Sequence, residues 1–253
     1  MTDRGTALVT GGARRIGRAL AQACAEAGFD VAIHVRNPDD DADAAAGEVR
    51  SAGRKAALLA CDLRKESAVV ALVGEAEAEL GPVTLLVNCA SVFEEDAFQT
   101  LNRASWDLHM ETNLRAPLVL SQAFARRLAA DREGLIVNVL DQRVWRPTPR
   151  YFSYALSKSA LWAQTQMLAQ ALGPRIRVNA IGPGPTLRNK RQDDDDFGKQ
   201  VEGLILKRGP QLPEFGATIR YLWQARSVTG QMIALDGGQH LAWQTPDVTG
   251  MVE

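Results

Sequence analysis

Seven short apolar runs recur along the chain, and longer stretches with helical character separate them. Each run is rich in Val, Ile, Leu and Ala and is apolar throughout, whereas a half-buried strand would alternate with polar residues. Continuous apolar strands are typical of parallel sheets, because helices cover both faces of such a sheet. The expected strands cover residues 6–10, 30–35, 55–61, 83–88, 134–140, 175–181 and 231–236.

Stretches with helical character fill the intervals between these runs. We expect helices over the acidic segment that ends at Ala52 and over residues 15–27, 66–80, 103–129, 151–172 and 214–225. Alternating strands and helices predict an α/β fold: one Rossmann-type doubly wound domain, residues 1–253, whose seven-stranded parallel sheet is flanked by helices. No internal repeat or linker rich in Gly, Ser and Pro divides the sequence.

Charge and cysteine usage argue against several classes of protein. Lys and Arg number 29 against 30 Asp and Glu, so nothing favours a nucleic-acid surface. Cys24, Cys61 and Cys89 lack the spacing of a zinc site or a redox pair, so we expect no metal, and isolated cysteines fit a reducing compartment. The sequence has neither a leader peptide nor an apolar run of the roughly 20 residues that a membrane helix needs. We therefore expect a soluble cytoplasmic protein without a membrane partner.

One long segment, Gly182 to about Gln200, reads as irregular: GPGPTLRNKRQDDDDFGKQ. It follows the sixth expected strand, at the carboxyl edge where open α/β sheets bind ligands. Long loops at such places are often lids. We expect a mobile substrate lid at about residues 183–213, with a plain surface loop as the alternative.

A Gly-rich turn, in the stretch ALVTGGARRIG, joins the first expected strand to the first helix. Free backbone N–H groups and the helix dipole favour an anion at such a helix start. Gly11 lets the chain turn sharply, and Gly17 lets the helix pack close to the sheet. The spacing departs from G-x-G-x-x-G, so the turn alone is a weak signal of dinucleotide binding.

The end of the second strand, HVRN, indicates which nicotinamide cofactor is used. Proteins that bind NAD usually place an acidic residue there to hold the ribose 2′-hydroxyl, whereas Arg36 and Asn37 stand here. An arginine can pair with a 2′-phosphate, and Arg14 can approach the same phosphate, so we expect NADPH. A surface charge is the alternative for Arg36, and His34 is interpreted as an ordinary buried strand histidine.

The stretch YALSK places Tyr154 and Lys158 four residues apart, on one face of a helix. A nearby ammonium is expected to lower the pKa of the tyrosine from about 10, which makes it a usable general acid. The spacing is common by chance, so the context matters. Asp141 follows the fifth strand, and Asn113 lies inside an expected helix where Asn is a poor choice.

Polar groups also end the third and fourth strands. Asp62 and Leu63 follow the third strand, where an adenine could rest, and Asn88 ends the fourth. As a set in chain order, the motif residues resemble those of the short-chain dehydrogenase/reductase family, over essentially the whole chain: Gly11, Gly17, Asp62, Asn88, Asn113, Tyr154 and Lys158.

The resemblance implies reduction or oxidation of C=O, C–OH, C=N or C=C groups with a nicotinamide. Tyr154 would then be the proton donor, Lys158 would hold the nicotinamide ribose, and Asn113 would hold a water of the proton relay. It also implies a homotetramer, formed through the long helices. The implied cofactor contacts are Gly11, Arg14, Arg15, Ile16, Arg36, Asn37, Asp62, Leu63, Asn88, Ala90, Ser91, Lys158, Pro183 and Gly184.

Two departures narrow the resemblance. The usual family pattern has a glycine where Arg15 stands and a serine where Asp141 stands. Both departures occur together in the pteridine reductases and the related dihydromonapterin reductases, which are also called alternative dihydrofolate reductases. Their T-G-x-x-x-R-x-G turn matches Thr10–Gly17, and their Asn-Ala-Ser-x-Phe segment is similar to residues 88–93.

This subfamily implies a role for each departing residue. Arg15 would neutralise the pyrophosphate and face the substrate, Ser91 would bind the pterin, and Phe93 would stack on its ring. Asp141 would work beside Tyr154 in delivering a proton to a ring nitrogen. If ionised, Asp141 raises the pKa of the tyrosine, and the pair should titrate together. The alternatives are a helix cap or turn residue for Asp141, a core residue for Phe93 and a solvated first-turn residue for Arg15.

We therefore expect an NADPH-dependent reductase that converts dihydromonapterin, dihydrobiopterin or dihydrofolate to the tetrahydro form. One alternative is a generic carbonyl reductase of the same family, such as a 3-oxoacyl-carrier-protein or sugar reductase. The other is a non-catalytic NADPH-binding regulator.

Overall fold

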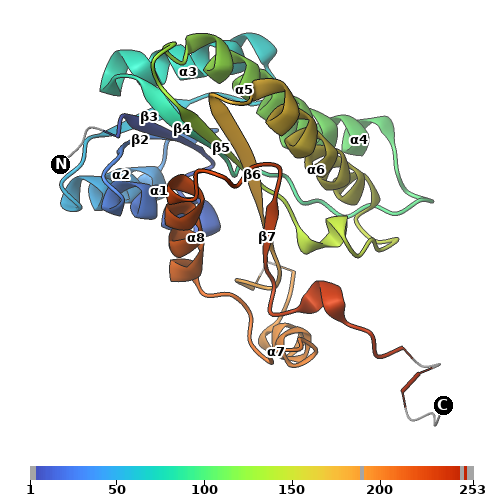
Figure 1. Cartoon of the computed structure of the whole chain (residues 1–253). Helices are drawn as coiled ribbons and strands as arrows, with labels where there is room; N and C mark the ends of the chain where they lie inside the picture. Colours follow the sequence, from blue (N-terminus) through green and yellow to red (C-terminus); the bar gives the residue numbers. More distant parts are fainter. Residues whose placement is uncertain (1–3, 189–190, 246–247, 250–253) are drawn as a thin grey trace.

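The strands of the computed structural model, which describes residues 4–188, 191–245 and 248–249, pair in one parallel sheet (Figure 1). The sheet has seven strands in the order β3-β2-β1-β4-β5-β6-β7, so the predicted seven-stranded parallel sheet is confirmed. The strands are β1 (Thr6–Thr10), β2 (Asp30–Val35), β3 (Ala56–Ala60), β4 (Val83–Asn88), β5 (Gly134–Val139), β6 (Ile176–Pro183) and β7 (Met232–Leu235).

Helices cover both faces of the sheet (Figure 1). One face carries α1 (Arg15–Glu26), α2 (Asp40–Ser51) and α8 (Leu212–Gln224). The opposite face carries α3 (Glu66–Leu80), α5 (Ala116–Arg127) and α6 (Phe152–Leu172), with α4 (Arg103–Met110) beside α6. Among the described residues, no helix is long and apolar enough to cross a bilayer.

Strands β1 and β4 each contribute to two separate cores, which explains why their central residues are all apolar. Ala7 and Val9 of β1 lie in the core beneath α1, α2 and α8, whereas Leu8 lies in the core beneath α3, α5 and α6. Val87 and Leu86 of β4 divide in the same way. Successive side chains of a strand point to opposite faces, so a sheet covered on both faces needs apolar residues at every position.

The helix expected over residues 103–129 is interrupted in the structure. A π-helical turn, Glu111–Arg115, separates α4 from α5 and contains Asn113. The expected helical stretch is therefore present from Arg103 to Arg127, but it includes a π-helical turn that the apolar pattern does not reveal. Such π-turns are frequent at functional sites.

The segment from Gly182 to Gln200 is also more regular than expected. Helix α7 (Asp194–Glu202) begins inside it, and the side chain of Asp193 caps its first turn by accepting from Asp196 N (2.7 Å). Acidic side chains in the first turn are favourable against the helix dipole, so the acidic run starts a helix. Residues 189–190 of the expected lid lie outside the described residues. The lid and the single domain remain predictions.

The carboxyl ends of the strands converge on one edge of the sheet. The chain leaves β1 and β4 in opposite directions along the sheet order, so neighbouring β1 and β4 form a topological switch point. Ligands of open α/β sheets bind at the carboxyl ends of the strands beside such a point. The candidate site lies there.

Candidate active site

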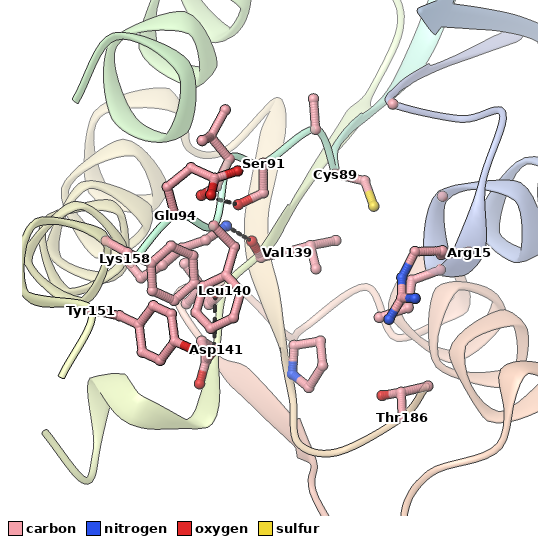
Figure 2. Close-up of a pocket in the computed structure, with 18 of the residues that line it drawn as sticks. Arg15, Cys89, Ser91, Glu94, Val139, Leu140, Asp141, Tyr151, Lys158 and Thr186 are labelled. Atoms are coloured by element: carbon pink, nitrogen blue, oxygen red, sulfur yellow. Dashed lines mark hydrogen bonds between the residues drawn. The ribbon is translucent and has the colours of Figure 1, made fainter. Parts of the chain in front are cut away.

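A cavity of about 1400 Å³ opens at this edge of the sheet (Figure 2). Its walls come from the turn after β1, the loops after β4 and β5, helix α6 and the segment after β6. All the predicted catalytic, cofactor and substrate residues line it except Asn37, Asn88 and Asn113. The volume exceeds that of a typical small-ligand site, so it suits a large ligand or two ligands together.

Two glycines make the turn after β1 possible. Gly11 has a φ of 65°, and a Cβ there would lie 2.9 Å from the Cα of Ala90. A Cβ on Gly17 would lie 2.0 Å from the carbonyl oxygen of Gly11. Any other residue would therefore push the turn away from the loop after β4, or α1 away from the turn.

His34 holds this turn in place. Its Nδ1 accepts from the backbone N–H of Gly11 (3.4 Å), so Nε2 carries the proton and donates to the carbonyl oxygen of Cys61 (3.1 Å). Burial lowers the pKa of His34, which keeps the ring neutral as both contacts require. The interpretation as a buried strand histidine is correct, but it missed this link between the ends of β1 and β3.

Arg15 has a backbone conformation that favours glycine. Its φ is 52°, in the left-handed region that favours glycine. Its guanidinium reaches across the cavity and donates to the carbonyl oxygens of Leu187 (2.8 Å) and Arg188 (2.9 Å). In Figure 2 it lies on the side of the cavity opposite Asp141 and Tyr151.

The expected 2′-phosphate residues lie at the outer end of the cavity. Arg36 is exposed there, whereas Arg14 forms ion pairs with Asp39 (2.5 Å) and Asp41 (2.6 Å). Asn37 is exposed outside the cavity lining. An anion binding here would compete with two carboxylates for Arg14.

The two residues that bear the expected adenine contacts also line this end. Asp62 is held by Arg64, which donates to both carboxylate oxygens, and these hydrogen bonds lower the pKa of Asp62 to about 2. Leu63 is buried beside it. The carboxylate is therefore ionised at neutral pH.

Asp141, Tyr154 and Lys158 meet at the inner end of the cavity. The hydroxyl of Tyr154 donates to Oδ2 of Asp141 (2.9 Å). The ammonium of Lys158 donates to the carbonyl oxygen of Val139 (2.8 Å) and lies 5.8 Å from the centroid of the Tyr154 ring. The structure thus joins three residues that are up to 17 positions apart in sequence (158 − 141) and come from two elements.

The pKa of Tyr154 shifts in the direction opposite to the one expected from Lys158. Burial, followed by the charge of Asp141 and its hydrogen bond, raises the pKa well above 10. Burial also lowers the pKa of Lys158 to about 8, although Asp141 opposes this shift. The expectation of a lowered tyrosine pKa is therefore wrong, because the motif spacing carries no information about burial.

Asn113 supports the loop after β4 and lies outside the cavity lining. Its Oδ1 accepts from the backbone N–H of Val92 (2.8 Å), and its amide donates to the carbonyl oxygen of Val92 (2.9 Å) and to Oγ of Ser157 (3.1 Å). Both amide hydrogens are engaged with the protein, so these contacts do not support the expected role of holding a water. Asn88 is buried, and its amide donates to Oδ1 of Asn138 (2.8 Å).

The substrate side of the cavity is aromatic. Phe93 stacks on Tyr151, with ring centroids 4.2 Å apart and planes 19° apart, and it meets Tyr154 edge-on at 4.6 Å. Phe93 lies in the cavity lining, where the core alternative would not place it. Tyr151, with a φ of 55° just before α6, was missed because its contact with Phe93 joins two distant loops.

His109, which the sequence left without a role, fixes the loop that carries Phe93. It is fully buried, and its Nε2 accepts from the backbone N–H of Glu94 (3.1 Å). Its Nδ1 faces Oγ of Ser153 (2.7 Å), which in turn donates to the carboxylate of Asp96. The sequence shows a histidine within an expected helix, but only the fold shows which groups it contacts.

A family model described as short chain dehydrogenase matches residues 5–196. The chain belongs to this family. Within the described residues, no cluster of His, Cys, Asp and Glu side chains is arranged to hold a metal ion.

Two solved structures are similar to this chain over nearly its whole length. FolM alternative dihydrofolate reductase 1 from Brucella canis, crystallised with NADP, is 51% identical, with a TM-score of 0.94 and coverage of 98% of this chain and 99% of that chain. The protein of the same name from Brucella suis, also in complex with NADP, is 52% identical, with a TM-score of 0.94 and coverage of 98% and 100%.

A curated relative carries the name of a reductase that acts on a different class of substrate from dihydrofolate. The 3-oxoacyl-(acyl-carrier-protein) reductase FabG of Staphylococcus epidermidis is 28% identical over 93% of this chain and 99% of its own length. The family membership therefore leaves the substrate of this short-chain dehydrogenase open between at least two chemical classes.

Proposed function

We propose that this short-chain dehydrogenase is an NADPH-dependent reductase of a pterin-type substrate, namely dihydromonapterin, dihydrobiopterin or dihydrofolate, and yields the tetrahydro form. The observation that carries the proposal is the hydrogen bond from the Tyr154 hydroxyl to Asp141 Oδ2 (2.9 Å), at the inner end of an aromatic cavity. A serine at position 141 would suit a carbonyl oxygen. A carboxyl group beside a phenol suits the protonation of a ring nitrogen, because either group can carry the proton that C=N reduction requires.

The residues at the outer end of the cavity fit NADP(H). The first turn of α1 has neither an acidic residue nor a side-chain cap, so its N–H groups remain able to bind a phosphate. Gly11 and Gly17 allow the close backbone approach that a pyrophosphate needs. Arg36 and Arg14 would hold the 2′-phosphate, and both FolM structures contain NADP.

The chain's own residues would hold and release the proton. When bound, NADPH supplies the hydride. Because the pKa of Tyr154 is raised, the phenol is protonated at neutral pH. Its hydroxyl can therefore donate a proton to a substrate bound in the cavity. The loss of that proton leaves a phenolate beside a carboxylate, and the ammonium of Lys158 provides an opposite charge 5.8 Å from the ring.

The aromatic and basic side chains would orient the substrate. Phe93 has one face against Tyr151, so a planar ring would use its other face or replace Tyr151. Ser91 lies on the same loop, with its hydroxyl 3.3 Å from Asn113 Oδ1, and would bind a polar edge of the ring. Arg15 would neutralise phosphate charge from the opposite wall.

A turnover assay tests the proposed function. The purified protein is mixed with NADPH and, in separate reactions, a dihydropterin, dihydrofolate, a 3-oxoacyl thioester and a simple diketone, and NADPH absorbance is followed. We expect oxidation with at least one dihydropterin or with dihydrofolate. Turnover of the thioester or diketone alone would support the generic carbonyl reductase, which the FabG relative favours. NADPH binding without any turnover would support the regulator.

Replacement of Asp141 by serine should separate pterin reduction from cofactor binding. We expect the pterin kcat to fall about 10²-fold, the lower end of what acid–base groups contribute. The NADPH Kd should stay the same, because Asp141 contacts Arg143 and Tyr154, away from Arg36 and Arg14. Steady-state kinetics and fluorescence titration measure the two quantities, with exposed Asp131→Ser as the matched control. Equal losses in both would contradict the role given to Asp141.

Replacement of Arg15 by glycine should weaken the site without unfolding the protein. Glycine removes the steric cost of a left-handed backbone at this position, which stabilises the fold by about 1–2 kcal/mol. Its greater backbone freedom in the unfolded chain destabilises the fold by about 0.5–1 kcal/mol. The free energy of unfolding should therefore change little, whereas loss of a charged hydrogen bond to phosphate should raise the NADPH Kd about tenfold. Chemical denaturation and cofactor titration test both. A large loss of stability would show that the two carbonyl contacts of Arg15 matter chiefly to the fold.

We also propose that the protein forms a homotetramer and is located in the cytoplasm. Trp106 on α4 and Leu156 and Met167 on α6 are exposed apolar side chains on the helices expected to form a homotetramer. Light scattering after size-exclusion chromatography would test the tetramer. The cytoplasmic location rests on three cysteines that are free in the structure.

A further inference from the structure

Both oxygens of Asp141 are bound by a residue two positions further along the chain. Asp141 precedes a 3₁₀ turn, Gln142–Val144, and its Oδ1 accepts from the backbone N–H of Arg143 (2.8 Å). Its Oδ2 accepts from Nη1 of the Arg143 guanidinium (3.1 Å). The hydroxyl of Tyr154 donates to this same Oδ2 (2.9 Å). One carboxylate oxygen is therefore shared between the arginine and the tyrosine.

This arrangement orients the carboxylate. The backbone contact holds Oδ1 toward the turn, so Oδ2 is directed at Tyr154. The side chains of Arg143 and Asp141 are only 21% and 15% exposed, so solvent screens the pair less than a surface ion pair. Without the guanidinium, Oδ2 would lose one of its two donors, and the carboxylate would be freer to turn toward solvent.

Charged and titratable groups from three elements face Tyr154. Asp141 and Arg143 come from the loop after β5, Lys158 from α6, and the neutral ring of His109 from α4, 6.1 Å from the tyrosine ring. Burial and Asp141 raise the pKa of Tyr154, and the charge of Arg143 lowers it. Burial lowers the pKa of His109 as well. Arg143 thus offsets the carboxylate that it holds.

Arg143 also contacts the aromatic stack. Its guanidinium carbon lies 5.4 Å from the Phe93 centroid and 5.5 Å from the Tyr151 centroid, while these centroids are 4.2 Å apart. A point nearly equidistant from two stacked rings lies beside the stack and not over either outer face. The side chain therefore leaves the outer face of Phe93 uncovered by its guanidinium and links the stack to the Asp141–Tyr154 pair.

We propose that Arg143 is a positioning residue of this site, which holds Asp141 against the Tyr154 hydroxyl. Its positive charge eases release of the tyrosine proton. Its contacts with Phe93 and Tyr151 fix the position of the Asp141–Tyr154 pair relative to the two stacked rings. The inference rests on the proposed reductase function. Lysine would keep the charge without the planar fork, and glutamine would keep polarity without the charge. The two substitutions therefore separate charge from geometry.

The test compares Arg143→Gln and Arg143→Lys with Arg146→Gln, an exposed arginine of the same loop whose guanidinium donates to the carbonyl oxygen of Gln239. Profiles of kcat against pH are recorded with a dihydropterin and with a diketone, together with the NADPH Kd. We expect Arg143→Gln to lower kcat about 10-fold or more. The basic limb of the profile should move to lower pH, because Asp141 raises the pKa of Tyr154 more than Arg143 lowers it, and the released carboxylate no longer contacts the phenol. Arg143→Lys should restore the limb and only part of kcat, and Arg146→Gln should behave as the wild type.

A crystal structure of Arg143→Gln provides a readout that needs no substrate. We expect the Asp141 carboxylate to turn away from the Tyr154 hydroxyl. The inference is overturned by a variant that keeps this hydrogen bond, or by an unchanged profile with either substrate. Failure of the wild type to oxidise NADPH with any pterin would instead refute the proposed function, and the diketone profile and the crystal structure would still decide the role of Arg143.

Discussion

Replacing Tyr154 with phenylalanine should lower kcat for the pterin substrate about 10²- to 10⁴-fold, the contribution that a positioned general acid makes. Phenylalanine keeps the ring, which meets Phe93 edge-on at 4.6 Å and His109 at 6.1 Å, so the packing of the site is preserved. Only the hydroxyl that donates to Asp141 Oδ2 (2.9 Å) is removed. The chemical step should therefore slow without a matching loss of NADPH binding.

Single-turnover kinetics and cofactor titration separate these two effects. Tyr221→Phe is the matched control, because Tyr221 is half exposed on α8, away from the cavity lining. A Tyr154→Phe enzyme with kcat close to that of the wild type would mean that another group delivers the proton. Asp141 or a water would then be the donor, and the proposed mechanism would be wrong.

Replacing Lys158 with methionine should make the protein more stable and less active. The Lys158 side chain is 2% exposed, and burial lowers its pKa from 10.5 to about 8. At about 1.4 kcal/mol for each pKa unit, the buried charge is disfavoured by about 3 kcal/mol relative to its neutral form. Methionine fills similar space without charge. After loss of one hydrogen bond, worth about 1 kcal/mol, we expect a gain of about 2 kcal/mol at neutral pH.

The pH dependence of this gain is a sharper test. Below pH 8 the lysine is protonated in both the folded and the unfolded chain, so the full penalty is present. Between pH 8 and 10.5 the folded chain releases a proton that the unfolded chain keeps, so the stability of the wild type rises with pH. The advantage of Lys158→Met should therefore shrink across this window. Denaturation of the cofactor-free protein at several pH values measures it, and a constant advantage would contradict the lowered pKa.

The activity of Lys158→Met should fall by about 10²-fold or more, because no cation would remain on α6 to offset the phenolate. A variant that is both more stable and less active is the pattern expected of a residue kept for function. Loss of stability together with activity would instead indicate that Lys158 serves the fold.

Most of the fold could be predicted because each strand carries its own signal. Strands such as β4 and β5 are buried at every position and consist mainly of apolar residues, as a parallel sheet covered on both faces requires. The π-turn at Glu111–Arg115 could not be predicted, since one extra residue is accommodated by backbone hydrogen bonds and leaves no mark in composition. Helix α7 was missed because its acidic first turn reads as a solvated run until Asp193 is recognised as its cap.

The residues of the candidate site likewise divide into those with a local sequence signal and those without one. Gly11, Arg15, Tyr154 and Lys158 could be found because their spacing is a local property of one turn and one helix. His34, His109 and Tyr151 could not be assigned, because their partners lie on other elements. Their roles exist only after the chain has folded.

The sequence by itself determined the order of the elements, the glycines of the turn and the presence of a phenol, an amine and a carboxyl at one edge of the sheet, since strand burial, steric limits and helical spacing act over a few residues. Only the tertiary structure decided the acid strengths of these groups. Burial sums contributions from every element around a side chain, and the Tyr154 pKa therefore rises where its neighbour Lys158 alone predicted a fall. The tertiary structure also lets Arg143 and Tyr154 donate to the same carboxylate oxygen of Asp141. This shared contact requires both the turn after β5 and helix α6.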